Sequence, residues 1–178
     1  GVEEVFKLYN ERLVRKLEQK MLQLEEETAA LRKVEEDLYL SEKKYRRLHE
    51  TMTDGFVYTD MAGVIKESNE SYRRMLGYTA EDLVRMTYID LTPKKWHDFE
   101  RNIVKTQILV DDFSDVYEKE YIKKDDTVFP VELRAFLVRN DQGVAEGMWA
   151  IVRDITERKR VEKLNSELER QLYQAQKM

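Results

Sequence analysis

Hydrophobic residues recur every three or four positions along the first fifty residues of the chain. The series contains Val2, Phe6, Tyr9, Leu13, Leu17, Met21, Leu24, Leu31, Val34, Leu38, Tyr45 and Leu48. This spacing predicts one long amphipathic α-helix, and no glycine or proline interrupts residues 2–52. Such a helix would be roughly 70 Å long, whereas a domain of about 100 residues has a radius of gyration of about 13 Å. Most of the helix must therefore project from any folded domain.

A shorter stripe of the same kind ends the chain and contains Val161, Leu164, Leu168, Leu172, Ala175 and Met178. Thr156 is expected to cap this helix, with Glu157 in its first turn, where the helix dipole favours an acidic residue. Leucine rows need a partner helix in water, so both helices are expected to form parallel coiled coils in a homodimer. The residues assigned to this dimer interface are Leu17, Leu24, Leu31, Leu38, Tyr45, Val161, Leu164 and Leu168. Thr28, Glu35 and Ser41 interrupt the longer seam, which predicts an imperfect supercoil.

The middle of the chain alternates between strand and short-helix patterns and predicts an α+β domain. Apart from Gly1, every glycine and proline lies between residues 55 and 147. Strands are predicted at 55–60, 64–67, 114–124, 127–139 and 145–154, with a tight turn at Asp125-Asp126. Short helices are predicted at 69–76 and 80–86, and a longer one at 96–109.

Composition narrows the function. The chain has 178 residues with a net charge of −5, so no nucleic-acid partner is indicated, and acids interleave the basic clusters that would suggest a DNA-binding zipper. No apolar stretch approaches the roughly 20 residues of a membrane span, so we expect no membrane contact in this segment and a cytoplasmic location. The sequence leaves open whether a membrane segment lies upstream of Gly1. The absence of cysteine excludes disulfides, a cysteine nucleophile and flavin–cysteinyl photochemistry.

Three stretches carry a resemblance to a known family: "NESYRRMLGYTAEDL" at 69–83, "KKDDTVFPVEL" at 123–133 and "GMWAIVRDITERKR" at 147–160. With the order of the elements, they resemble the PAS sensory-domain family over residues 41–160. The resemblance implies a five-stranded antiparallel sheet with small helices on one face, flanked by the two coiled-coil helices. The expected divisions are a signalling helix at 1–48, a PAS domain at 49–156 and a second signalling helix at 157–178. Asp126 stands where the family usually has glycine, which predicts a somewhat strained turn.

A modest ligand cavity is expected inside this domain. The residues assigned to it are Tyr72, Met75, His97, Tyr117, Tyr121, Val131, Leu133, Ala135, Met148 and Ala150. A packed core without a ligand is the alternative. In haem-binding oxygen sensors of the family a histidine on the longer helix ligates iron, and His97 sits at a similar position, although Tyr117 replaces their distal arginine. The sequence requires no cofactor and has no metal-ligand spacing outside this haem alternative.

The last strand runs directly into the last helix, because no glycine or proline separates Ile151 from Arg160. Asp154, Ile155 and Thr156 resemble the strand-exit triad of the family. The resemblance implies that Asp154 pairs with Lys123 or Lys124 and that Thr156 caps the helix. We expect this junction to transmit a change in the cavity wall to the coiled coil.

The expected function is a sensory and dimerisation module of a signal-transduction protein. "LNSELERQLYQAQKM" at 164–178 resembles the linker that precedes the phosphoacceptor helices of sensor histidine kinases, which implies a downstream kinase domain in a two-component phosphorelay. His49 and His97 are in no phosphoacceptor context, so the segment itself is expected to be non-catalytic. The alternatives are a haem gas sensor, a ligand-free structural dimerisation spacer and the PAS unit of a diguanylate cyclase.

Overall fold

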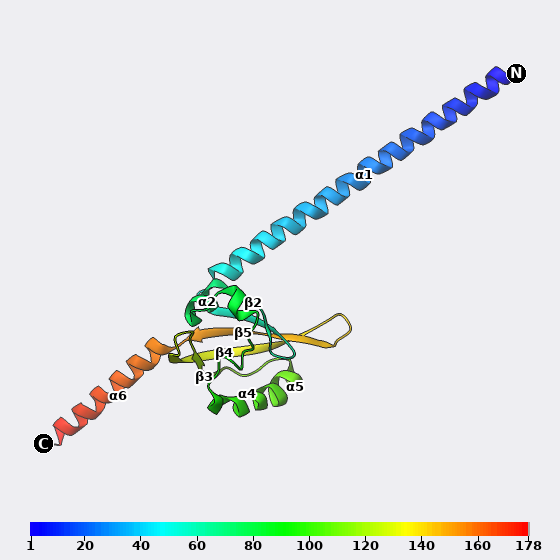
Figure 1. Cartoon of the computed structure of the whole chain (residues 1–178). Coiled ribbons are helices and arrows are strands. Elements are labelled where there is room, and N and C mark those ends of the chain that lie inside the picture. Colours follow the sequence, from blue (N-terminus) through cyan, green and yellow to red (C-terminus); the bar gives the residue numbers. More distant parts are fainter. Residues whose placement is uncertain (178) are drawn as a thin grey trace. The chain divides into compact units, whose positions relative to one another are not determined.

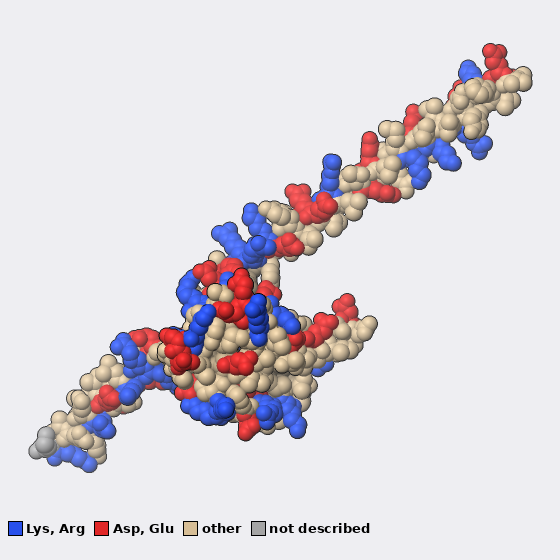
Figure 2. Space-filling model, in the orientation of Figure 1, with Lys and Arg blue, Asp and Glu red and all other residues tan. Residues whose placement is uncertain are grey.

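The computed structural model describes residues 1–177, which divide into a first unit, Gly1–Leu48, and a second that begins at His49. Residues 2–48 of helix α1 (Val2–Thr51) make up nearly all of the first unit, and the helix confirms the predicted long helix. The five interface residues expected on α1 are all more than half exposed in the single chain. Acidic and basic side chains are interspersed along the length of this helix (Figure 2). The charge pattern and the exposed apolar row are typical of a helix that pairs with another helix.

The second unit contains a five-stranded antiparallel sheet, as predicted. Its strands are β1 (Gly55–Asp60), β2 (Ile65–Ser68), β3 (Tyr117–Ile122), β4 (Val128–Arg139) and β5 (Ala145–Asp154). The spatial order is β2-β1-β5-β4-β3, so the last strand in sequence lies at the centre and pairs with both β1 and β4. A movement of β5 therefore affects both halves of the sheet.

Short helices cover one face of this sheet. They are α2 (Glu70–Leu76), α3 (Ala80–Leu83), the 3-10 turn η1 (Lys94–Trp96), α4 (His97–Ile103), the π-helical turn η2 (Val104–Ile108) and α5 (Leu109–Asp111). Figure 1 shows α4 and α5 on the same side of β3 and β4. The single helix predicted at 96–109 is thus divided into three pieces. Hydrophobic spacing does not distinguish α from π turns, and π turns occur often at functional sites.

Asn69 ties the start of the domain to the sheet. Its buried side chain accepts hydrogen bonds from the backbone N–H groups of Phe56 (2.8 Å) and Tyr72 (2.9 Å). Its amide group donates to the carbonyl oxygens of His49 (3.1 Å) and Asp54 (3.0 Å). Because all four bonds are internal, replacing this side chain would leave several buried backbone groups without partners.

The turn between β3 and β4 has the predicted strain. Asp126 adopts φ +64°, a conformation that favours glycine. The Asp125 carboxylate accepts a hydrogen bond from the backbone N–H of Thr127 at 3.0 Å, which stabilises the turn.

Helix α6 (Thr156–Gln176) follows β5 after one residue, and its interface residues Val161, Leu164 and Leu168 are exposed. Met178, the last residue of the predicted stripe, lies outside the described residues. None of the helices among residues 1–177 is both long and apolar enough to cross a membrane.

Candidate functional site

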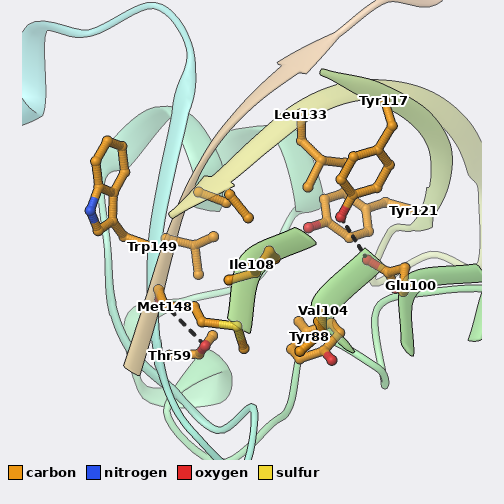
Figure 3. A pocket seen from close by; sticks show the side chains of 13 residues that line it. Thr59, Tyr88, Glu100, Val104, Ile108, Tyr117, Tyr121, Leu133, Met148 and Trp149 are labelled. Atoms are coloured by element: carbon orange, nitrogen blue, oxygen red, sulfur yellow. Dashed lines mark hydrogen bonds between the residues drawn. The ribbon is translucent and has the colours of Figure 1, made fainter. Parts of the chain in front are cut away.

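A cavity of about 50 Å³ lies between the helix-covered face of the sheet and the helical segment α4–η2 (Figure 3). Six of the predicted cavity residues line it: Tyr117, Tyr121, Leu133, Ala135, Met148 and Ala150. They come from β3, β4 and β5, whose alternation places every second side chain on this face. Strand periodicity therefore located one wall of the cavity from sequence.

The other four predicted residues do not line the cavity. Tyr72 and Val131 are fully buried in the core, and Met75 packs against the core from its edge. The Tyr72 hydroxyl lies 3.4 Å from that of Tyr121, so it touches a cavity residue from behind. His97 lies on α4, where its Nε2 is 2.8 Å from the carbonyl oxygen of Thr92.

These residues do not fit haem ligation. His97 is absent from the cavity lining, and its Nε2 is engaged by the Thr92 backbone. The cavity volume of about 50 Å³ is far below the roughly 300 Å³ at which pockets for drug-sized ligands begin, and haem is larger than such ligands. In the described part of the chain, no three His, Asp or Glu side chains are grouped so that they could hold a metal ion.

A buried ion pair lies beside the cavity. Lys119 on β3 is 1% exposed and Glu100 on α4 is 4% exposed. The Lys119 ammonium donates a short hydrogen bond to Glu100 Oε1 and another to Thr92 Oγ1 at 2.9 Å. It also lies 4.3 Å from the centre of the Tyr121 ring, within cation–π range. The pair thus connects α4 to β3 across the core.

Burial dominates the titration of this cluster. Desolvation lowers the pKa of Lys119 to about 8, although the adjacent Glu100 carboxylate opposes the shift. Desolvation, with a smaller contribution from the Glu100 charge, raises the pKa of Tyr117 well above its ordinary value. Desolvation also raises the pKa of Tyr121. At neutral pH the cavity therefore holds neutral phenols next to the Lys119 ammonium.

One of the two Glu100 carboxylate oxygens, Oε2, has no hydrogen-bond donor among the described residues. Glu100 Oε1 accepts from Lys119 and, at a long 3.5 Å, from the Tyr117 hydroxyl. Figure 3 shows Glu100 and Tyr117 reaching toward each other from α4 and β3. Glu100 Oε2 is buried and accepts no hydrogen bond from any of residues 1–177. A buried carboxylate oxygen without a donor is unfavourable, so this atom is a candidate ligand contact.

The charged part of this site was not predicted from the sequence. The additional lining residues are Val57, Thr59, Tyr88, Glu100, Val104, Ile108 and Trp149. Lys119 was detectable, because it lies between Tyr117 and Tyr121 in the strand alternation and so shares their face. Glu100 had a weaker signal, one helical turn before Ile103 and Val104 on an apolar stripe.

The strand–helix junction is built differently from the expectation. The Asp154 carboxylate accepts hydrogen bonds from Thr156 N (2.8 Å) and Thr156 Oγ1 (2.5 Å), and α6 begins at Thr156. Asp154 therefore supplies the side-chain acceptor at the start of the helix, and the prediction that Thr156 is the cap is wrong. Ile155 between them is 2% exposed and anchors the junction in the core.

The two lysines expected to pair with Asp154 have other contacts. Lys124 forms an ion pair with Asp82 at 2.7 Å, and Lys123 lies 4.7 Å from the centre of the Phe129 ring. The expected pairing of Asp154 with Lys123 or Lys124 is therefore wrong. Lys124 connects the turn to α3 rather than to the start of α6.

An exposed ion cluster instead joins α6 to the sheet. Arg158 donates to Glu132 Oε2 at 2.9 Å and to Glu118 Oε1 at 2.7 Å, and Lys159 approaches Glu118 Oε2 at 2.6 Å. The hydrogen bond from Lys159 lowers the pKa of the Glu118 carboxyl. Since Glu118 is on β3 and Glu132 on β4, the first turn of α6 is attached to both strands.

Curated proteins similar to this chain include two sensors and a probable diguanylate cyclase. The sensor histidine kinase TmoS of Ectopseudomonas mendocina is 26% identical over 141 residues, which cover 77% of this chain and 14% of that protein. The methyl sulfide methyltransferase-associated sensor of Methanosarcina acetivorans is 27% identical over 124 residues, which cover 68% of this chain and 12% of that protein. The probable diguanylate cyclase DgcE of Escherichia coli is 28% identical over 131 residues, which cover 72% of this chain and 12% of that protein. The chain thus spans 12% to 14% of the length of these relatives.

Solved structures agree on the fold. The PAS domain of a protein from Colwellia psychrerythraea superposes with a TM-score of 0.61 at 20% identity, covering 65% of this chain and 97% of that one. A family model for the PAS domain matches residues 53–157, which is more than half of the sequence. The matched span contains the sheet, the short helices, the cavity and the junction with α6. This chain belongs to the PAS domain family.

Proposed function

We propose that this chain is the sensory and dimerisation module of a signal-transduction protein, most directly a histidine kinase. In this proposal residues 1–48 and 157–178 are signalling helices, and residues 49–156 sense a stimulus in the cavity. The similarity to the sensor histidine kinase TmoS supports the assignment. The segment performs no catalytic step of its own.

The observation that carries the proposal is the stiff connection from the cavity wall to α6. Met148 and Ala150 of β5 line the cavity, and the same strand continues to Asp154 and the start of α6. The ion cluster of Arg158 and Lys159 with β3 and β4 attaches the first turn of the helix to the sheet and supports this coupling. A change in the cavity wall is therefore passed to α6 as a displacement.

The exposed apolar rows of α1 and α6 support dimerisation. Exposure of a long row of leucines to water is unfavourable. A parallel coiled coil with a second copy of the chain buries this row. The polar interruptions Thr28, Glu35 and Ser41 weaken the seam, so two registers of similar free energy become accessible. A stimulus that favours one of them shifts the population of the two arrangements.

The test uses the absence of cysteine in the chain. Gln171→Cys introduces a single thiol on α6 for a spin label. Double electron–electron resonance then measures the distance between the two labels in a dimer. Ala150→Val enlarges a cavity wall residue and imitates an occupied site. We expect this change to shift the mean label distance by roughly 1–2 Å or more, the scale of helix displacements in signalling interfaces.

The matched control separates the ion cluster from charge in general. Arg158→Ala combined with Lys159→Ala should abolish the shift, whereas Lys163→Ala combined with Arg170→Ala, on the same helix, should leave it intact. Sedimentation showing a monomer, or a label distance that ignores Ala150→Val, would contradict the proposal.

The similarity to DgcE supports a second candidate, in which the same module controls a diguanylate cyclase. The coupling through β5 and α6 is identical in both cases, because it does not depend on the domain that receives it. Assays of autophosphorylation and of cyclic dinucleotide synthesis in the protein that carries this segment separate the two.

A further inference from the structure

The unpaired oxygen of Glu100 indicates what the cavity binds. Glu100 lines the cavity and is 4% exposed, and its Oε2 accepts no hydrogen bond from the described residues. Its other oxygen already accepts from Lys119 and Tyr117. What the site lacks is therefore a hydrogen-bond donor at Oε2, and not an acceptor.

The neighbouring ammonium does not supply this donor. A lysine has three N–H bonds. Those of Lys119 are directed to Glu100 Oε1, to Thr92 Oγ1 at 2.9 Å and toward the face of the Tyr121 ring. No described residue supplies the donor for Oε2, which leaves this role to a molecule that enters the cavity.

Charge excludes ions from this position. Glu100 and Lys119 neutralise each other in a buried site. A cation next to them would leave a net positive charge without a counter-charge, and an anion would be repelled by the Oε2 atom it must approach. The molecule that fits is neutral.

Size and wall chemistry define the rest of the molecule. A cavity of about 50 Å³ exceeds the roughly 10–15 Å³ required by one water molecule and is far smaller than a pocket for a drug-sized ligand. Ile108, Leu133 and Met148 present apolar surface to it, and Figure 3 shows these three side chains between β4, β5 and η2. A compact apolar body of a few heavy atoms is complementary to this wall.

We propose that the cavity binds a small neutral molecule that donates one O–H or N–H hydrogen bond to Glu100 Oε2 and packs its apolar body against Ile108, Leu133 and Met148. This inference rests on the proposed sensory function and names the chemical class of the stimulus as a short-chain alcohol or amide.

Three compounds with the same four-carbon skeleton test the proposal. 2-Butanol carries a neutral donor, butanone carries only an acceptor, and sec-butylammonium carries a cationic donor. Each is titrated at neutral pH into the ¹⁵N-labelled 178-residue chain, and the dissociation constant is read from the amide resonances of β3, β5 and η2. We expect 2-butanol to bind about tenfold more tightly than the other two, the ratio for one hydrogen bond to a charged acceptor.

The double variant Glu100→Leu with Lys119→Met identifies the acceptor. It removes both charges at similar side-chain volume, and its folding is checked by thermal unfolding. We expect 2-butanol and butanone to bind this variant with constants within about twofold of each other. If the variant does not fold, the ratio between the three compounds in the unaltered chain decides by itself.

Three results would overturn the proposal: equal binding of 2-butanol and butanone to the unaltered chain, tighter binding of sec-butylammonium, or no binding of any of them at its solubility limit. A preference for 2-butanol that survives in the double variant would also overturn it. These results concern the ligand class alone. The spin-label experiment on Ala150→Val tests the sensory coupling without any ligand, so the two proposals fail separately.

Discussion

Strand β3 carries two kinds of charge on its two faces. Lys119 points into the core, where it is 1% exposed and pairs with Glu100. Its sequence neighbour Glu118 points outward and pairs with Arg158 and Lys159 at the start of α6, with all three side chains about two-fifths exposed. The same carboxylate–cation chemistry thus occurs twice, on adjacent residues, in different dielectric surroundings.

The difference teaches that burial decides what an ion pair does. An exposed pair gains little free energy, because water screens it and two long side chains lose rotamer freedom. A buried pair contributes little compared with two apolar side chains, but removing one partner leaves a charge without compensation. The inner pair therefore fixes how α4 meets β3 and presents an acceptor to the cavity, whereas the outer cluster orients α6 at small energetic cost.

The largest effect is expected from breaking the inner pair. Lys119→Met removes the strongest hydrogen-bond donor to the buried Glu100 carboxylate and leaves both of its oxygens poorly bonded, so the free energy of unfolding should fall by about 3–5 kcal/mol. Denaturant unfolding followed by circular dichroism measures this change. Glu100→Leu added to Lys119→Met should restore most of the loss, because no charge then remains in the core. A loss below about 1 kcal/mol for the single variant would mean that the pair behaves like a surface pair.

An intermediate effect is expected from pH. The pKa of Lys119 is lowered from 10.5 to about 8 by burial. Between these two pH values the unfolded chain binds more protons than the folded chain at this residue, so its contribution to the free energy of unfolding rises with pH. The destabilisation by the buried charge is complete below about pH 8. It disappears as the pH approaches the pKa of lysine in the unfolded chain, 10.5. Denaturant titrations should show that the free energy of unfolding of the unaltered chain, minus that of the double variant Glu100→Leu with Lys119→Met, rises by on the order of 2 kcal/mol from pH 8 to pH 10.

The double variant Glu100→Leu with Lys119→Met serves as the control for this pH dependence, because it lacks the titrating lysine. The raised pKa values of Tyr72, Tyr88, Tyr117 and Tyr121 lower the stability as the pH approaches the ordinary tyrosine pKa of about 10. Both proteins contain these tyrosines, so the difference between them reports the lysine. A difference between the two proteins that stays constant from pH 8 to pH 10 would contradict the assigned shift.

The smallest effect is expected from the outer cluster. Glu118→Gln removes the carboxylate that Arg158 and Lys159 share, yet the free energy of unfolding should change by less than about 1 kcal/mol, because the charges are exposed. The midpoint of denaturant unfolding measures this difference against the unaltered chain. A loss comparable to that of Lys119→Met would show that the cluster is a structural element of the core and not a positioning contact for α6.

Much of the site was readable from strand alternation, and its polar centre was not. Alternation assigned Leu133, Ala135, Met148 and Ala150 to the cavity because each faces the same side of a regular strand. Strand alternation also places Lys119 on that side. A lysine in a strand is nevertheless expected to face solvent unless a partner for its charge is known. That partner, Glu100, lies on α4 and reaches Lys119 only once the helix packs on the sheet.

The junction illustrates the same limit. The family resemblance identified Asp154 and Thr156, and the structure uses both, but the resemblance could not assign their bonds. Which basic residue meets which acid depends on how β3, β4 and α6 are placed. Arg158 and Lys159 reach Glu118 because α6 leaves the sheet beside β3, a direction that no local pattern encodes.

The sequence alone determined the periodic features of this protein: the long helix, the five strands, the turn at Asp126, the apolar rows and the absence of cysteine. Each of these follows from residue spacing or composition, which act along the chain. The tertiary structure alone decided the division of the helix at 97–111, the buried pair of Glu100 and Lys119, and the attachment of α6 to β3 and β4. These depend on contacts between distant segments, where burial, and not spacing, sets the free energy of a charge.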